Sequence, residues 1–177
     1  NYGCISDFLE TSFHALQEIT MRFSAEFAIR EFYCQFPKET FQQMKLRALD
    51  KNYHVRRLAS EWSRPYLPRW KKIPLLPHQW LELLELLRKD TTSYVIRSVA
   101  NHCNDISKQY PQLIIDTISR WEDANYHDKK TMNYLIRHAL RTMIKQWNAD
   151  ALKYIGYPEP RIKNHKLTIH TPQVSLW

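Results

Sequence analysis

The 177-residue sequence predicts an all-α fold, in which helix pairs repeat along the chain to form a solenoid. Glycine occurs twice and proline nine times, which disfavours tight hairpins and favours long helices separated by proline-marked turns. An apolar residue followed two positions later by arginine recurs every 40 residues, at Val55 and Arg57, Val95 and Arg97, and Leu135 and Arg137. An internal period of about 40 residues is typical of HEAT-like helical repeats.

Three helices are expected before the first arginine-bearing repeat. Apolar spacing predicts the first over residues 7–22. Ser24 can cap the second, which we expect to end before Pro37, and the third is expected over about residues 41–50. Residues 1–50 carry 5 basic and 7 acidic side chains, so we interpret this acidic part as scaffold.

The repeat region is expected to alternate arginine-bearing helices with outer helices. The arginine-bearing helices are predicted over residues 54–63, 94–109 and 130–146. Asn52 can cap the first of them. Outer helices are expected over about residues 80–87 and from Pro111, and a last short helix over residues 149–155 precedes Gly156, which suits a helix C-terminus.

Residues 63–77 interrupt this pattern with four prolines, which prevent a continuing helix. Cationic and aromatic side chains interleave in this loop, at Arg64, Tyr66, Arg69, Trp70, Lys71 and Lys72. Such a mixture suits phosphate contacts combined with stacking on a base or sugar. The alternative is that Tyr66 and Trp70 pack the loop onto neighbouring helices, and the sequence leaves both interpretations open.

We divide the chain into a helical-repeat domain, residues 1–157, and an extended tail, residues 158–177. Residues 166–170 alternate in polarity as a strand does. One or two strands do not form an independent domain. The tail is therefore expected either to pack against the helices or to begin a β-domain.

The formal net charge of +8 comes from the part of the chain after residue 50, which contains 21 basic and 11 acidic side chains. A basic surface of this size indicates an anionic partner, nucleic acid first. A basic but merely solvated surface is the alternative.

The three cysteines, Cys4, Cys34 and Cys103, are widely spaced and form no CxxC pair, which argues against a disulfide framework or a zinc site. We expect no metal, no cofactor and a reducing, cytoplasmic setting. No apolar run approaches the roughly 20 residues of a membrane span, so no membrane partner is expected.

The repeated arginines share helix faces with further polar side chains, because helix positions four apart lie on one face. Three faces result: Arg57 with Glu61, Arg97 with Asn101 and Asp105, and Arg137 with Arg141 and Lys145. Stacked repeats would place these faces on one concave surface. This surface would be rich in cations, with two carboxylates among them.

Two interpretations of this surface remain open. In the structural one, Arg57 pairs with Glu61 and Arg97 with Asp105, and the pairs bridge adjacent repeats. In the functional one, the cations follow a phosphate backbone and the ionised carboxylates face a sugar, where they stabilise developing positive charge or orient water.

Four runs of sequence carry a resemblance to a known family: ITMRFSAEFAIR (19–30), HVRRLASEWSRPYLP (54–68), SYVIRSVANHCNDISK (93–108) and IRHALRTMIKQW (136–147). Together they resemble the bacterial DNA alkylation repair glycosylases of the AlkC branch of the AlkC and AlkD superfamily. The resemblance extends from about residue 8 to residue 157. It implies a HEAT-like α-solenoid that holds duplex DNA. The implied activity is that of a monofunctional glycosylase, which hydrolyses the N-glycosidic bond of cationic 3-methyladenine or 3-methylcytosine and so initiates base excision repair.

The resemblance also implies roles for individual residues. Asp105 and Glu61 become the catalytic carboxylates, and Asp105 is the preferred candidate for orienting water. The DNA contacts are expected from Arg57, Arg64, Trp70, Arg97, Asn101, Arg137, His138, Arg141 and Lys145. Where family members usually have a small residue after the glutamate, this chain has Trp62, which could wedge against DNA, narrow the groove or fill the core.

Some members of this branch continue into an immunoglobulin-like domain, and residues 158–177 resemble the truncated start of one. We expect a monomer in the bacterial cytoplasm, associated with the nucleoid when bound to DNA. The alternative function is a non-catalytic HEAT-repeat module that binds DNA or an acidic protein. A truncated member that has lost activity is a third possibility.

Overall fold

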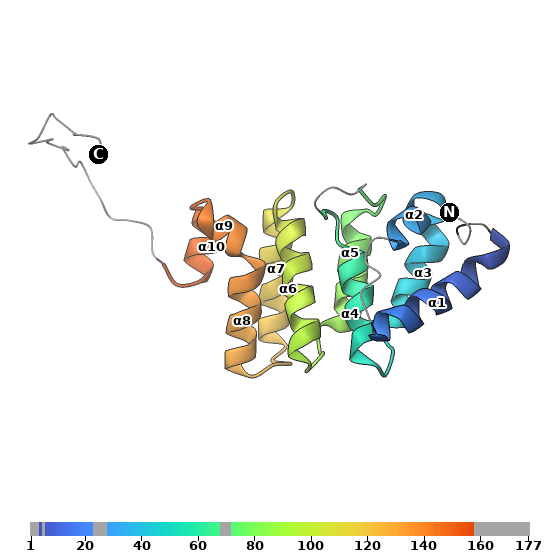
Figure 1. The fold of residues 1–177 in the computed structure, drawn as a ribbon. Coiled ribbons are helices and arrows are strands. Elements are labelled where there is room, and N and C mark those ends of the chain that lie inside the picture. Colours follow the sequence, from blue (N-terminus) through green and yellow to red (C-terminus); the bar gives the residue numbers. More distant parts are fainter. Residues whose placement is uncertain (1–3, 5, 23–27, 68–71, 158–177) are drawn as a thin grey trace, which may run out of the picture.

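The structure, a computed structural model, describes residues 4, 6–22, 28–67 and 72–157 of the chain. All regular secondary structure in these residues is helical, so the all-α prediction is confirmed (Figure 1). The expected tail, residues 158–177, lies outside the described residues, as do Ser24 and Trp70.

A short 3-10 helix, η1 (Ser6–Phe8), comes before the α-helices. These are α1 (Leu9–Arg22), α2 (Ile29–Gln35), α3 (Pro37–Ala48), α4 (Tyr53–Trp62), α5 (Pro77–Leu87), α6 (Ser93–Ser107), α7 (Pro111–Asp123), α8 (Lys129–Ala139), α9 (Arg141–Lys145) and α10 (Ala149–Tyr154). Prolines 37, 77 and 111 each open a helix, because the first helical position needs no N–H donor and suits the fixed φ of proline. Pro37 therefore starts α3 four residues before the predicted start.

The arginine-bearing helices lie side by side. Helix α4 packs on α6, and α6 packs on α8, while α5 and α7 form a second layer behind them (Figure 1). This arrangement confirms the expected alternation of inner and outer helices. It places equivalent positions of successive repeats next to one another, which is what the 40-residue period requires.

Two helix ends lie where the sequence predicts them. The Asn52 side chain caps α4 by accepting a hydrogen bond from the His54 N–H at 2.9 Å. Gly156 follows α10 with a φ of +89°, and the next residue, Tyr157, donates its N–H back to the Leu152 carbonyl at 2.9 Å. Both positions follow local capping rules.

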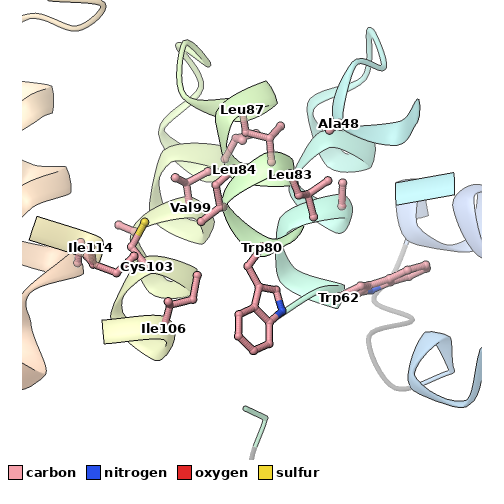
Figure 2. Close-up of a cluster of buried hydrophobic side chains, with 14 of the residues drawn as sticks. Ala48, Trp62, Trp80, Leu83, Leu84, Leu87, Val99, Cys103, Ile106 and Ile114 are labelled. Atoms are coloured by element: carbon pink, nitrogen blue, oxygen red, sulfur yellow. The ribbon is translucent and has the colours of Figure 1, made fainter. Parts of the chain in front are cut away.

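The core is continuous from α3 to α7. Figure 2 shows its labelled side chains, Ala48, Trp62, Trp80, Leu83, Leu84, Leu87, Val99, Cys103, Ile106 and Ile114. Trp62 is 1% exposed, so of the three roles considered for it the structure supports core filling.

Two leucines of the predicted third helix do not join the core. Phe41 and Met44 are buried, but Leu46 and Leu49 are 64% and 66% exposed. Leu46 lies two residues after Met44, a rotation of about 200° around the helix axis, so it points away from the buried face.

The third arginine-bearing helix is broken between α8 and α9, where the sequence predicts one continuous helix. In a continuous helix the Thr142 N–H would donate to the His138 carbonyl. Instead it donates to Asn104 Oδ1 of α6 at 3.1 Å, and Arg141 Nη1 donates to the His138 carbonyl at 2.7 Å. Because the helix is broken between Arg137 and Arg141, the two side chains do not share one helix face, contrary to the prediction from their four-residue spacing.

Candidate functional site

The two carboxylates singled out by the sequence are bound to the same guanidinium group. Glu61 lies in the last turn of α4, Asp105 lies in the last turn of α6, and Arg64 follows α4. Arg64 Nη1 donates to Glu61 Oε1. Arg64 Nε donates to Asp105 Oδ2 at 2.8 Å, and Nη2 lies 2.7 Å from the same oxygen. The fold thus joins two adjacent repeats through one cation.

The other two carboxylate oxygens also have partners. Ser98 donates its hydroxyl to Glu61 Oε2 at 2.7 Å, and Arg57 Nη2 lies 4.0 Å from that oxygen. Lys108 Nζ donates to Asp105 Oδ1 at 2.8 Å. We call Glu61, Arg64, Ser98, Asp105 and Lys108 the carboxylate cluster.

The carboxylates of this cluster are buried beneath their cations. The side chains of Glu61 and Asp105 are 8% and 3% exposed, whereas 15% of the Arg64 side chain and 43% of the Lys108 side chain are accessible. A ligand arriving from solvent therefore meets the cations first. The helix C-termini beside both carboxylates add the partial negative charge of their free carbonyl groups. This part of the protein favours a positive charge.

The segment that carries Arg64 is held from behind by α2. Arg30 Nη2 donates to the Arg64 carbonyl at 2.6 Å, and the hydroxyls of Tyr33 and Ser63 hydrogen-bond at 2.6 Å. Burial by itself would lower the pKa of Arg64, but the charges and hydrogen bonds of the two carboxylates raise it above its ordinary value. Arg64 is therefore a permanent cation.

His102 of α6 is fully buried near this segment. Burial lowers its pKa to about 3, and the positive charges of Arg64 and Arg30 contribute in the same direction. The imidazole is therefore neutral in the folded protein at any pH near neutrality.

A second set of side chains links the repeats along the first two turns of the inner helices. We call this set the arginine ladder, and it consists of Arg57, Tyr94, Arg97 and Tyr134. The Arg57 guanidinium lies 4.7 Å from the centre of the Tyr94 ring. Arg97 Nε donates to the Tyr134 hydroxyl at 3.1 Å, and the ring of His138 stacks on that of Tyr134 at 4.9 Å. Each of these two arginines thus contacts a tyrosine of the next repeat, Arg57 at the ring of Tyr94 and Arg97 at the hydroxyl of Tyr134.

Of the two ion pairs predicted in the structural interpretation, the pair between Arg97 and Asp105 is not formed, so that prediction is wrong. Arg57 lies close to Glu61, as predicted, but Arg97 contacts Tyr134 and Asp105 binds Arg64 and Lys108. Positions eight apart on a helix are separated by about 12 Å along its axis, too far for a direct pair.

A hollow of about 690 Å³ adjoins the arginine ladder. Tyr94, Arg97 and Tyr134 line it together with Lys130 and Thr131 of α8. The hollow combines cationic, hydroxyl and aromatic groups with the carboxylate of Asp128, and no residue of the carboxylate cluster lines it.

The remaining predicted contact residues lie on α6, α8 and α9. Arg141 is partly buried, and burial together with the charge of Arg64 lowers its pKa, while Asp105 opposes this effect. Arg137 is exposed and lines a smaller hollow of about 270 Å³ that also includes Tyr154 of α10. Asn101 is partly buried and Lys145 is exposed.

This chain is similar to known proteins. No family model matches the chain. A Bacillus subtilis (strain 168) protein described as "Uncharacterized protein YhaZ" is 38% identical over 171 residues, which cover 94% of this chain and 47% of that protein. The Pseudomonas fluorescens alkylpurine DNA glycosylase AlkC, in a structure bound to DNA containing an abasic site analog, is 40% identical with a TM-score of 0.76. That match covers 85% of this chain and 42% of the AlkC chain.

The resemblance to the AlkC branch is confirmed. The described residues have the AlkC helical-repeat fold. The chain spans less than half the length of both similar proteins.

Sequence reasoning missed four residues of the AlkC-like inner layer: Ser98, Lys108, Tyr94 and Tyr134. Signals for three of them exist. Tyr94 and Tyr134 are 40 residues apart, the same interval as the arginines, and Lys108 lies one helical turn after Asp105. Ser98 has no such signal, because its contact with Glu61 depends on how α4 packs against α6.

The described part of the AlkC-like chain has no group of three or more His, Cys, Asp or Glu side chains arranged to hold a metal ion. Among the same residues, no helix combines the length and apolar character needed to cross a bilayer. The expectation that no metal or cofactor is needed stays a prediction.

Proposed function

We propose that this chain carries the activity of a DNA glycosylase that hydrolyses the N-glycosidic bond of cationic N-alkylated bases in duplex DNA. The observation that carries the proposal is the carboxylate cluster, in which two carboxylates and two helix C-termini surround one position for a cation. The similarity to the Pseudomonas fluorescens alkylpurine DNA glycosylase supports it. As in the sequence-based expectation, 3-methyladenine and 3-methylcytosine are the proposed substrates.

The chemistry of such a substrate suits this site. A base that carries a positive charge is already a good leaving group, so no acid is needed to protonate it. As the bond between the base and C1′ breaks, the bonding electrons leave with the base and the positive charge moves to the sugar. Carboxylates placed beside the sugar stabilise that charge more in the transition state than in the ground state.

In the proposed mechanism Glu61 stabilises the sugar cation and Asp105 orients the attacking water. The water oxygen bonds to C1′, and its proton passes to Asp105 and then to solvent. The products are the neutral free base and an abasic site, the starting point of base excision repair.

The proposed DNA contacts follow the inner helices. Arg57, Arg97, Arg137, Arg141 and Lys145 bind backbone phosphates, as cations do in other DNA-binding proteins. Tyr94 and Tyr134 hold the first two of these arginines in place. We propose that the protein acts as a monomer in the bacterial cytoplasm, associated with the nucleoid.

The test compares two aspartates whose side chains are buried. Both the Asp105 and the Asp90 side chains are 3% exposed, and each is bound to an arginine: Asp105 to Arg64, and Asp90 to Arg56 at 2.5 Å. Asp90 precedes α6, whereas Asp105 lies in its last turn. Base release from duplexes containing 3-methyladenine or 3-methylcytosine is measured by mass spectrometry.

Asp105→Asn is expected to reduce excision at least about 100-fold, because it removes the charge that orients water. Asp90→Asn is expected to lose similar stability but to keep excision within a few-fold of the unmodified chain. Equal losses in the two variants would mean that Asp105 is only structural.

The second candidate function is a non-catalytic module that binds DNA. The pairing of both carboxylates with cations favours it, because ion pairs of this kind also occur as structural links. Duplex binding that weakens steeply with salt but releases no base would support this alternative.

A further inference from the structure

We propose that Arg64 occupies the cation site of the carboxylate cluster in the free protein and leaves it when a cationic ligand binds, so that Arg64 makes the site selective for positive charge. The nature of the ligand, a positively charged nucleotide, rests on the proposed function. The cation site itself rests on the structure of the free chain.

The guanidinium of Arg64 resembles, in shape and charge, the cationic ligand that would displace it. It is planar, its charge is delocalised, and it donates in its own plane. Its Nη1 reaches Glu61, and its Nε and Nη2 reach Asp105. An N-alkylated base or a sugar cation likewise carries delocalised positive charge in a planar group.

The carboxylates are held in place without help from Arg64. Ser98 of α6 holds Glu61 Oε2 at 2.7 Å, and Lys108 holds Asp105 Oδ1 at 2.8 Å. The oxygens that face Arg64 are the other two. The site can therefore keep its shape when the guanidinium leaves.

The exchange is selective because both carboxylates are buried. Removing one partner from a buried ion pair leaves an uncompensated charge, which is strongly unfavourable. A cationic ligand replaces the charge of Arg64, whereas a neutral ligand does not. Displacement of Arg64 by an unmodified, neutral base therefore costs more free energy than displacement by a cationic ligand, because the buried carboxylates would be left without a cation.

Arg64 is also placed so that its side chain can move while its backbone stays. The backbone carbonyl is held by Arg30 at 2.6 Å, and 15% of the side chain already reaches solvent. A guanidinium released at this point can bind a phosphate, to which it is well suited. This accounts for Arg64 both as the resident cation of the free chain and as the DNA contact expected from the sequence.

The main experiment uses two DNA duplexes that differ in one charge. One contains a protonated pyrrolidine in place of an abasic sugar, and the other contains a neutral tetrahydrofuran. The Nε–H signal of Arg64 is followed by ¹⁵N NMR and assigned with Arg64→Lys. We expect the signal of the hydrogen-bonded Nε–H to persist with the neutral duplex and to be lost with the charged one. An Nε–H that stays bound to Asp105 in both complexes would overturn the proposal.

Affinities provide a second measurement. The ratio of affinities for the charged and the neutral duplex is expected to rise about tenfold in Arg64→Gln, because the competing cation is gone. In Asp105→Asn the ratio of affinities for the charged and the neutral duplex is expected to fall to about one. Arg56→Gln, which removes the matching arginine beside Asp90, is the control and leaves the ratio unchanged. A ratio that does not rise in Arg64→Gln contradicts the exchange.

A third measurement separates this proposal from the proposed function. Methylguanidinium is added to Arg64→Ala in the absence of DNA, with sodium chloride as the ionic-strength control. We expect a saturable rise in Tm in Arg64→Ala and none in the unmodified chain or in Arg64→Ala combined with Asp105→Asn. If neither duplex binds, the proposed function is wrong. The Tm response to methylguanidinium still tests whether the cation site exists. A Tm that does not respond in Arg64→Ala overturns the cation site itself.

Discussion

His102 makes the stability of this protein depend on pH in a way that can be measured. The imidazole is fully buried, and burial, with the charges of Arg64 and Arg30, lowers its pKa to about 3 in the folded chain. In the unfolded chain a histidine has a pKa of about 6.5. Between these two values the unfolded chain binds a proton that the folded chain does not, so acidification favours unfolding.

The size of the effect follows from the two pKa values. Between pH 7 and pH 5, His102 is expected to reduce the free energy of unfolding by about 2 kcal/mol. The result depends little on the folded-state value, because the folded imidazole is neutral throughout this range. Nearly all of the change comes from protonation of the unfolded chain.

The assay is urea unfolding followed by far-UV circular dichroism at pH 7, 6 and 5. His102→Phe keeps a planar ring without a titratable group, and it is expected to lose about 2 kcal/mol less than the unmodified chain over this range. His14→Gln, an exposed histidine of α1, is the control and retains the unmodified pH dependence. Carboxylates titrate in all three proteins, so their contribution cancels. If His102→Phe shows the same pH dependence as the unmodified chain, the assignment of a neutral buried imidazole is refuted.

The remaining predictions concern helix ends and α3, and urea unfolding checks each of them. Gly156→Ala is expected to lower the free energy of unfolding by about 1 kcal/mol, because φ is +89° there although an added Cβ would meet no atom within 4 Å. Trp147→Gly is expected to raise it by about 1 kcal/mol, because Trp147 is 82% exposed and has a φ of +56° at a position after α9 that favours glycine. Met44→Ala is expected to cost about 2–5 kcal/mol, whereas Leu46→Lys, at a 64% exposed position, is expected to change stability by less than about 0.5 kcal/mol. Similar losses for these two would contradict the orientation of α3.

The general architecture could be predicted because it depends on local rules. Proline at the first helical position, Asn52 as a cap and Gly156 after the last helix act through their own backbone geometry. The 40-residue period predicted that α4, α6 and α8 occupy equivalent places. Helix bounds were less accurate where apolar residues, such as Leu46 and Leu49, do not face the core.

The candidate site was predicted only in part. Helical spacing and the family resemblance singled out Glu61, Asp105 and the repeated arginines, and the structure brings the two carboxylates onto one cation. The spacing also suggested a pair between Arg97 and Asp105, which is wrong. Some side-chain partners come from neighbouring helices, as Ser98 does for Glu61, and spacing along one helix gives no information about them.

The sequence by itself determined that this chain is a helical solenoid with cations and carboxylates on its inner helices, because period, capping and composition are properties of the chain alone. Only the tertiary structure decided that Asn104 interrupts the helix before Arg141 and that Arg64 lies between Glu61 and Asp105. Both depend on the packing of α6 against its neighbours. The two buried carboxylates then hold a loop arginine as the cation that closes the site.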